Sequence, residues 1–414
     1  MIGRLVAALR DAPFLSAGRA RVYGRLWLIL QLGFAALMVG AFIRESVTVG
    51  GGKPVGTDFM TFWSAARMAV GGDPASAYDD TARAALQRAA AWMGSEPGAH
   101  FAYWYPPTFL LVTLPLGLLG YVPAMIAFLC AGYAVLGGCL KRIVPVRAVW
   151  VPLLLSPAML LNTLIGQNGA FTASCFGGAM VLLDRRPMLG GACLGLLVCK
   201  PHLAVAAPLA LAAARRWRAL AGWAATAFGL CALSWLLLGT ASWLLFLRHA
   251  SEARTVLEHL SDDWPKIQSV YTAVRLLHGG TVLGYVLHAM AALVSLAVLL
   301  GVARRRPGAA PEMATLVVVS LLCTPYMFDY DLTCLLVPMA FIAAAALRGG
   351  WLGWEKTLLL GLYGMPLVAR LVAMHAGVPL VPPALACLLA LCARRALARN
   401  IRGPGAAAAP MAVA

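Results

Sequence analysis

The chain has 414 residues, of which 61% are hydrophobic and only 12% are charged, and its mean hydropathy is +0.81. These values exclude a soluble globular domain. Apolar runs close to the length of a bilayer crossing recur between positions 26 and 396, separated by short basic or polar breaks. We therefore expect an all-α polytopic membrane protein with a single domain over residues 1–402, followed by a disordered Gly-, Ala- and Pro-rich tail over 403–414.

The net charge of +17 does not indicate a nucleic-acid partner. The Arg and Lys residues stand in short clusters at the ends of apolar runs, where the positive-inside rule expects them. All ten cysteines lie within apolar segments and none forms Cys-x-x-Cys, which argues against a disulfide framework and against a structural zinc site. We expect no cofactor and no metal.

The first apolar run, 26–43, follows five arginines and lacks a small-residue cleavage site, which is typical of an uncleaved signal anchor with a cytoplasmic N-terminus. Residues 44–103 then form a long first outer loop. Apolar and aromatic residues at helical spacing predict two short amphipathic helices in it, over 59–70 and 81–93, lying along the membrane surface.

Residues 105–140 are interrupted by four prolines and predict one broken crossing. Further spans are predicted over 147–163, 168–183, 188–200, 202–214, 219–239, 279–301, 312–325, 332–347, 351–372 and 380–396, which makes about twelve in all. A second long outer loop covers 242–278. The shortest spans extend only about 20 Å as helices, which is too short to cross a full bilayer. They therefore favour a cavity or a locally thinner helical bundle on the outer side.

Short polar motifs fall in the predicted outer turns, and there is no Walker loop and no Gly-x-Gly-x-x-Gly between a strand and a helix. No signature of a nucleotide-using enzyme is therefore present, and any activated donor must arrive through the membrane. The motif series resembles glycosyltransferase family 87 over nearly the whole chain. It consists of Gly56-Thr57-Asp58-Phe59, Gly72-Asp73-Pro74, Tyr78-Asp79, Tyr103-Trp104-Tyr105-Pro106-Pro107, Gly166-Gln167-Asn168, Lys200-Pro201, Thr324-Pro325-Tyr326 and Tyr330-Asp331.

The resemblance implies a GT-C-like bundle, a polyprenyl-phosphate sugar as donor, and a general base in the first outer loop. Asp58 stands at the matching place, and a carboxylate at the mouth of a membrane bundle is costly unless it has a function. The alternative is that Thr57 or Asp58 caps the following helix. The neighbouring residues are typical of turns and helix caps at the other acids of this loop, Asp73, Asp79 and Asp80.

A leaving lipid phosphate needs positive charge or N–H donors. Lys200 and His202 flank a proline at a predicted helix break and are candidate phosphate ligands, although Lys200 would equally suit snorkelling to the outer interface. Arg275 and His278 in the second loop, with Arg254 and Lys266 near them, are further candidates. For each of these four, a solvated loop face is the simpler interpretation.

The candidate sugar or acceptor ligands are polar and aromatic residues in outer turns: Tyr105, Gln167, Asn168, Tyr326, Asp329 and Asp331. Each has a structural alternative. Gln167 and Asn168 fit a helix-to-helix turn, the two aspartates fit an acidic outer turn, and the aromatic group 101–105 fits an interfacial belt. Two acids alone do not indicate a metal, because hard cations collect more oxygen ligands.

We therefore expect a membrane glycosyltransferase that moves a hexose, in the first instance mannose, to a lipid-linked or glycan acceptor at the outer face of a bacterial inner membrane. Both termini are expected to be cytoplasmic and the active site periplasmic. The alternative is a flippase or transporter of lipid-linked sugar. A transporter is expected to show an inverted repeat, and the long acidic first loop has no counterpart in the second half.

Overall fold

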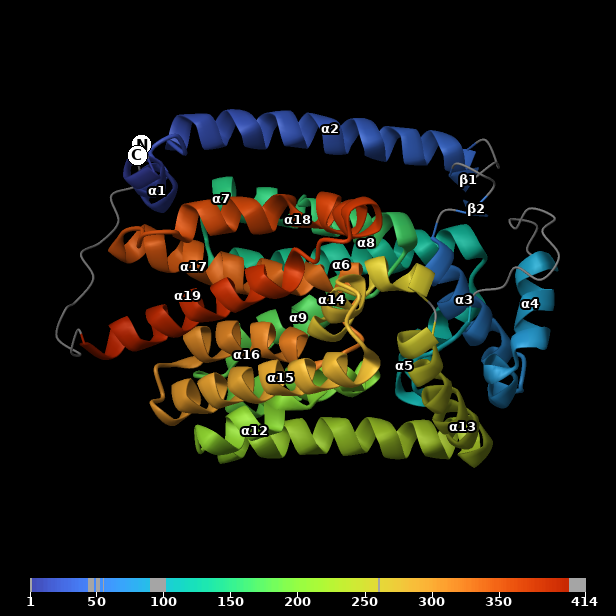
Figure 1. The fold of residues 1–414 in the computed structure, drawn as a ribbon. Coiled ribbons are helices and arrows are strands. Elements are labelled where there is room, and N and C mark those ends of the chain that lie inside the picture. Colours follow the sequence, from blue (N-terminus) through green and yellow to red (C-terminus); the bar gives the residue numbers. More distant parts are fainter. Residues whose placement is uncertain are drawn as a thin grey trace.

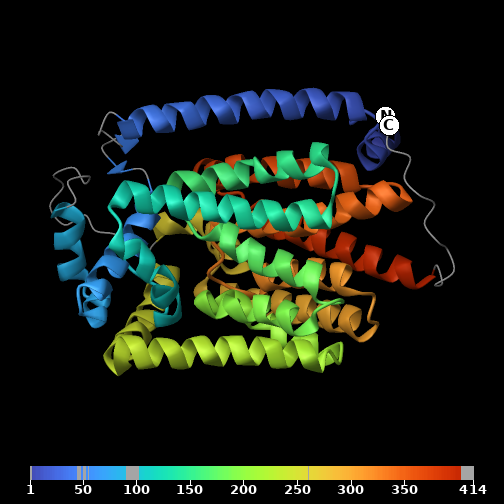
Figure 2. The ribbon, with the colours of Figure 1, turned by 180° about the vertical axis from the view of Figure 1, so that it is seen from behind.

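The computed structural model describes residues 2–43, 48–49, 53–54, 56–89, 102–259 and 261–401. Helices run side by side along one main direction, with α2 on one side of the bundle and α13 on the other, in both views (Figures 1 and 2). Within the described ranges the strands are two residues long, β1 (Thr48–Val49) and β2 (Lys53–Pro54), and they pair antiparallel. The predicted all-α polytopic fold is confirmed. The 403–414 tail and residues 90–93 of the second predicted loop helix lie outside the described residues.

The elements of the first half are α1 (Ile2–Asp11), α2 (Ala17–Ile43), α3 (Thr57–Val70), η1 (Pro74–Tyr78), α4 (Asp80–Ala89), α5 (Pro107–Thr113), η2 (Leu114–Leu118), α6 (Tyr121–Ile143), α7 (Arg147–Leu154), α8 (Pro157–Ile165), α9 (Gly169–Leu182), α10 (Pro187–Gly195), η3 (Leu196–Cys199), α11 (Pro201–Ala204) and α12 (Ala206–Ala213). Those of the second half are α13 (Trp217–His259), η4 (Ser261–Lys266), α14 (Val270–Leu276), α15 (Thr281–Arg304), α16 (Ala309–Cys323), η5 (Asp329–Leu335), α17 (Leu336–Gly349), α18 (Glu355–Ala376) and α19 (Val381–Ile401). The η elements are short 3₁₀ helices.

Seven helical segments within the described ranges are long and apolar enough to cross a membrane: Tyr121–Ile143, Arg147–Ile165, Trp217–His259, Thr281–Arg304, Asp329–Gly349, Glu355–Ala376 and Val381–Ala398. Shorter apolar helices cover Pro107–Leu118, Gly169–Leu182, Pro187–Cys199, Pro201–Ala213 and Ala309–Cys323. These segments match the predicted spans in position, and the total of about twelve crossings stays a prediction. The span predicted over 147–163 is divided into α7 and α8 because Pro157 starts a new helix.

The region after Gly239 differs from its predicted form. The span predicted over 219–239 ends at the non-helical Gly239, as expected, whereas the loop predicted over 242–278 is largely helical: a second helix runs to His259 and is followed by η4 and α14. Gly239 has φ 78° and ψ 164°, which lies outside the helical region and favours glycine, so α13 consists of two helices joined by a kink at this residue. The residues beyond the bend are mainly Leu, Ala, Arg and Glu, which favour helix.

Helix α3, predicted as an amphipathic surface helix, is buried along most of its length. Its buried hydroxyls are satisfied within the helix: Thr61 Oγ1 donates to the Asp58 carbonyl at 2.8 Å and Ser64 Oγ to the Met60 carbonyl at 2.7 Å. Trp63 Nε1 donates to the Leu119 carbonyl at 3.0 Å, and Arg67 Nη1 donates to the Gly117 carbonyl at 2.9 Å. A Cβ at Gly117 would lie 2.5 Å from the Ala66 carbonyl, so glycine allows η2 to lie directly against α3.

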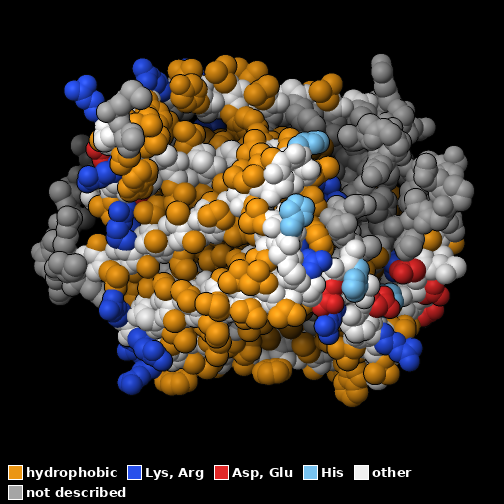
Figure 3. Space-filling model, viewed as in Figure 1, with side chains coloured by type: hydrophobic (Ala, Val, Ile, Leu, Met, Phe, Trp, Pro, Cys, Tyr) orange, Lys and Arg blue, Asp and Glu red, His pale blue; other side chains and the backbone are white. Residues whose placement is uncertain are grey.

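The two ends of the bundle differ in charge. Helix α1 and the end of α19 both contact the start of α18: Trp354 N donates to the Arg10 carbonyl at 2.7 Å, and Arg395 Nε donates to Glu355 Oε1 at 2.6 Å. In the space-filling view, Lys and Arg side chains line this end with few acids among them, whereas at the opposite end, near α3 and α4, Lys and Arg are mixed with most of the visible Asp and Glu side chains (Figure 3).

Candidate active site

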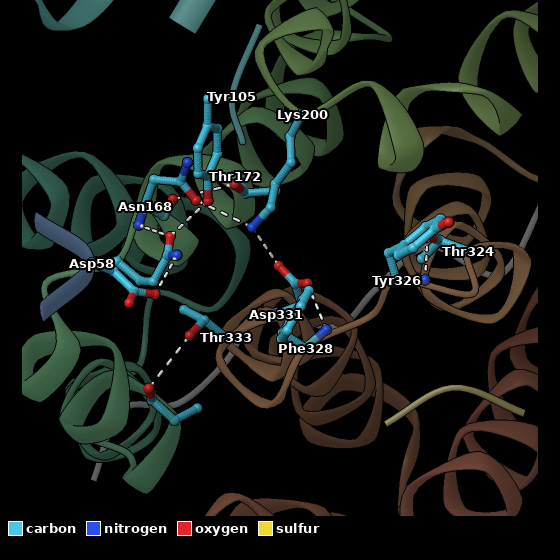
Figure 4. A network of polar contacts seen from close by, with 12 residues as sticks. Asp58, Tyr105, Asn168, Thr172, Lys200, Thr324, Tyr326, Phe328, Asp331 and Thr333 are labelled. Carbon is cyan, nitrogen blue, oxygen red and sulfur yellow. Dashed lines mark hydrogen bonds and ion pairs between the residues drawn. The ribbon is translucent and has the colours of Figure 1, made fainter. Parts of the chain in front are cut away.

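Four segments that are distant in sequence meet at the acidic end of the bundle. They are the start of α3, the turn between α8 and α9, the break before α11, and the segment that leads from α16 into η5. Figure 4 shows Asp58, Tyr105, Asn168, Lys200 and Asp331, drawn from these segments and from the residues just before α5, converging on one polar network.

Two glycines bring the first two segments together. Gly56 and Gly166 have φ of 76° and 70°, in the left-handed region, and Gly56 N donates to the Leu164 carbonyl at 2.9 Å. A Cβ at Gly166 would lie 2.5 Å from Cβ of Phe59 and 3.2 Å from Cα of Gly56. The close backbone crossing therefore requires glycine at 166, and it places Asp58 beside Gln167.

The Asp58 carboxylate is half-buried and accepts a hydrogen bond from Gln167 Nε2 on Oδ2 at 2.8 Å. The N-cap of α3 is Gly56, and no side chain caps the helix, so the alternative of Thr57 or Asp58 as a cap is wrong. Burial raises the pKa of Asp58 above its usual 3.8, while the bond from Gln167 and the positive charge of Lys200 lower it. A raised pKa brings the carboxylate closer to the range useful for taking up a proton.

The Gln167 amide is fixed in orientation by its neighbours. Its Oε1 accepts from the Tyr105 hydroxyl at 3.0 Å and from Asn168 N at 2.8 Å, which leaves Nε2 directed to Asp58. Gln167 and Tyr105 were predicted as sugar or acceptor ligands. In the structure they orient the Asp58 carboxylate, and the Tyr105 ring packs 4.5 Å from that of Phe109.

Lys200 and Asp331 form a buried ion pair. Lys200 Nζ donates to Asp331 Oδ1 at 2.5 Å and to Asn168 Oδ1 at 3.2 Å, and it lies 4.8 Å from the centroid of the Tyr330 ring. Only 4% of Lys200 and none of Asp331 is exposed, so the snorkelling alternative is wrong. Phe328 N donates to Asp331 Oδ2 at 3.0 Å. The positive charge of Lys200 and the negative charge of Asp331 therefore compensate each other without a ligand.

A second acid, the predicted ligand Asp329, lies two residues from Asp331 and is paired with a cation, Arg370, that was not predicted from the sequence. Asp329 is buried, and its Oδ2 is 3.6 Å from Nη1 of Arg370 in α18. Arg370 interrupts the apolar run 351–372, and an ionisable residue inside a membrane helix signals function. That signal was present in the sequence.

The structure does not bring every predicted ligand into this network. His202 is half-buried near Lys200, and its Nε2 has no hydrogen-bond partner among the described residues. Arg275 donates to Thr281 and to the Glu258 carbonyl and lies 4.6 Å from the centroid of the Trp264 ring, and none of these partners belongs to the network around Lys200 and Asp331.

Two more predicted ligands also have surroundings of their own. His278 is exposed, with φ 63°. Tyr326 packs against a separate apolar cluster of Leu257, Ile267 and Tyr271. Their roles as ligands stay predictions.

The remaining acids of the first loop have the structural roles that their settings suggested. Asp73 Oδ1 accepts from Ser76 N at the start of η1, and Asp79 Oδ1 accepts from Thr81 N and Ala82 N before α4. Asp80 pairs with Arg83. Within the described ranges, no three Asp, Glu, His or Cys side chains gather as metal ligands.

The geometry defines a site of one class: a carboxylate with a fixed orientation, next to a buried cation and acid, at one end of an all-α membrane bundle. Such a site is suited to proton transfer beside an anionic group. The family model of glycosyltransferase family 87 matches residues 103–325, more than half of the chain. The chain therefore belongs to glycosyltransferase family 87, as the motif series suggested, and is a membrane glycosyltransferase. No curated protein and no solved structure matches it significantly.

The matched range contains Tyr105, Gln167, Asn168 and Lys200, whereas Asp58 and Asp331 lie outside it. The network thus joins residues of the matched region to residues on both sides of it.

Proposed function

We propose that the chain transfers a hexose from a polyprenyl-phosphate donor to a lipid-linked or glycan acceptor, with Asp58 as the general base. The hexose that we propose is mannose. The observation that carries the proposal is the 2.8 Å hydrogen bond from Gln167 to Asp58, with Gln167 held by Tyr105. One carboxylate oxygen is oriented by this bond, and the other accepts a longer hydrogen bond of 3.4 Å from the Thr57 hydroxyl.

The reaction is one displacement with inversion. The acceptor oxygen attacks the anomeric carbon and forms the new glycosidic bond, while the bond from that carbon to the phosphate oxygen breaks and its electron pair stays on the phosphate. Asp58 takes the proton that the acceptor hydroxyl loses. A positioned base typically contributes a factor of about 10² to 10⁴ to such a step.

The leaving phosphate requires positive charge, for which we propose Lys200 and Arg370, with the His202 ring beside them. Both cations are already next to carboxylates, Lys200 to Asp331 and Arg370 to Asp329. Each pair keeps its cation in a fixed place without a ligand, so little reorganisation is needed when charge develops on the phosphate.

We also propose that the acidic end faces the periplasm of a bacterial inner membrane and that both termini are cytoplasmic. The support is the gathering of Arg and Lys at the end where α1 and the last turns of α19 lie, as the positive-inside rule expects (Figures 1 and 3). A polyprenyl-phosphate donor reaches the site from within the bilayer.

The test is to incubate the purified protein, in lipid nanodiscs, with labelled polyprenyl-phosphate mannose, polyprenyl-phosphate glucose or a nucleotide-linked mannose, each with total membrane lipid. We expect label in a new glycoconjugate from a polyprenyl-phosphate donor and none from the nucleotide. Transfer from the nucleotide alone would refute the donor class. Movement of labelled lipid across a liposome without a new glycosidic bond would favour the transporter instead.

A further inference from the structure

A pocket of about 450 Å³ lies at the end of the bundle opposite the active site. It is formed by the turn after α9, the end of α12, the start of α13 and the link from α15 to α16. Its polar lining consists of one acid, Asp184, and four arginines, Arg215, Arg216, Arg218 and Arg306. Neither the proposed reaction nor the family assigns a role to this pocket.

Close helix packing gives the pocket a fixed shape. A Cβ at Gly191 would lie 1.8 Å from the Ala219 carbonyl oxygen, and one at Gly222 would lie 2.1 Å from the Met188 carbonyl oxygen. Glycines at both positions let α10 and α13 lie in backbone contact. The turn before α10 is thereby held against the first turn of α13.

The side chains of two of the arginines make ion pairs or hydrogen bonds within the protein. Arg216 pairs with Asp184 at 2.9 Å and with buried Glu312 at 2.7 Å. Arg306 donates to the carbonyls of Ala214 at 2.7 Å and Arg215 at 3.3 Å. These contacts join three turns of the chain into one wall.

The other two arginines are available to a ligand. The side chains of Arg215 and Arg218 are exposed, and within the described part of the chain these two side chains make no hydrogen bond or ion pair. Arg215 and Arg306 also have φ of 53° and 50°, in the left-handed region that most residues avoid. Both residues follow the last turn of a helix, α12 or α15, where a left-handed residue closes the helix: Arg215 N donates to the Ala212 carbonyl and Arg216 N to the Leu211 carbonyl, both at 2.9 Å. The positive-inside rule explains why arginines lie at this end, but it does not explain why four of them surround one pocket.

The charge and the surroundings of the pocket indicate its ligand. Four guanidinium groups face at most two carboxylates, so the pocket is positive, and guanidinium matches phosphate oxygens in geometry. Apolar side chains are exposed beside it: Trp217 is 62% exposed, Met188 50% and Leu189 49%. We propose that the pocket binds the headgroup of an anionic phospholipid, with Arg215 and Arg218 on the phosphate and the acyl chains along α10 and α13.

The test compares lipid binding by the full-length protein in neutral detergent. Native mass spectrometry would count bound phosphatidylglycerol and phosphatidylcholine for the wild type, for Arg215→Gln/Arg218→Gln, and for the control Arg304→Gln/Arg305→Gln. The control removes two exposed arginines from the same end that do not line the pocket. We expect phosphatidylglycerol to bind roughly 30-fold more weakly to the pocket variant, about fivefold for each arginine, and unchanged to the control.

Equal binding by the wild type and the pocket variant would overturn the proposal, as would equal retention of phosphatidylcholine. A separate arm adds inorganic phosphate. Displacement of the lipid by phosphate at low millimolar concentration would assign the pocket to a free anion instead. If the double variant does not fold, Arg218→Gln alone is expected to weaken binding about fivefold, because this residue lies in an ordinary helical turn.

Discussion

Replacing Lys200 by Met should lower the free energy of unfolding of the protein by several kcal/mol. The substitution removes the ammonium group 2.5 Å from Asp331 Oδ1 and leaves a fully buried carboxylate without its partner. Breaking a buried ion pair from one side typically costs about 3–5 kcal/mol. The methionine itself fits an apolar position, so the unpaired Asp331 accounts for nearly all of the expected loss.

The companion variant is Lys200→Met/Asp331→Asn, which removes both charges while the amide oxygen still accepts from Phe328 N. We expect it to recover most of the lost stability, because replacing both members of a buried pair is often close to neutral. Unfolding would be followed by circular dichroism as sodium dodecyl sulfate is titrated into mixed micelles. A Lys200→Met protein as stable as the wild type, or a double variant as unstable as the single one, would refute this reasoning. In the stable double variant, a raised KM for the donor would report separately on the phosphate role of Lys200.

Three further outcomes are expected. Gly166→Ala should cost about 1–2 kcal/mol of stability from the left-handed backbone alone. It should also lower turnover, because the new Cβ would lie 2.5 Å from Cβ of Phe59 and push Asp58 away from Gln167. Gly361→Ala, whose Cβ would meet nothing within 4 Å, is the control, and equal effects of the two substitutions would contradict the account. Arg370→Gln should raise the KM for the donor about tenfold, as expected for a lost charge-assisted contact, and an unchanged KM would remove Arg370 from the site. Because the pKa of Asp58 is raised above 3.8 and the base must be ionised, kcat/KM should fall as the pH drops through a pKa above that value; a pH profile without this limb would exclude Asp58 as the base.

Much of the fold was predictable because hydropathy alone locates membrane helices. The described helices after Tyr121 follow the predicted spans closely, since apolar length and flanking charges are local properties of the sequence. The forms of α3 and α13 were not predictable in the same way. Burial of α3 depends on contacts with η2 and α6, and the second helix of α13, after the kink at Gly239, lies in a stretch polar enough to be taken for a loop.

The site was predictable as a set of motifs but not as a network. Asp58, Gln167, Asn168, Lys200 and Asp331 were all candidates, and the structure brings them together. The sequence did not reveal their pairing, because a separation of 131 residues between Lys200 and Asp331 carries no local signal.

The turnover of Asp58→Asn, measured on a preparation whose thermal stability is measured in parallel, tests the central claim most directly. The amide keeps the size of the carboxylate but does not accept a proton at neutral pH, so we expect transfer to fall by a factor of about 10² to 10⁴ with little change in unfolding temperature. Asp79→Asn is the matched control, since Asp79 caps α4 and asparagine caps equally well. If Asp58→Asn turns over near the wild-type rate, Asp58 is not the base, and Asp329 becomes the next carboxylate to test.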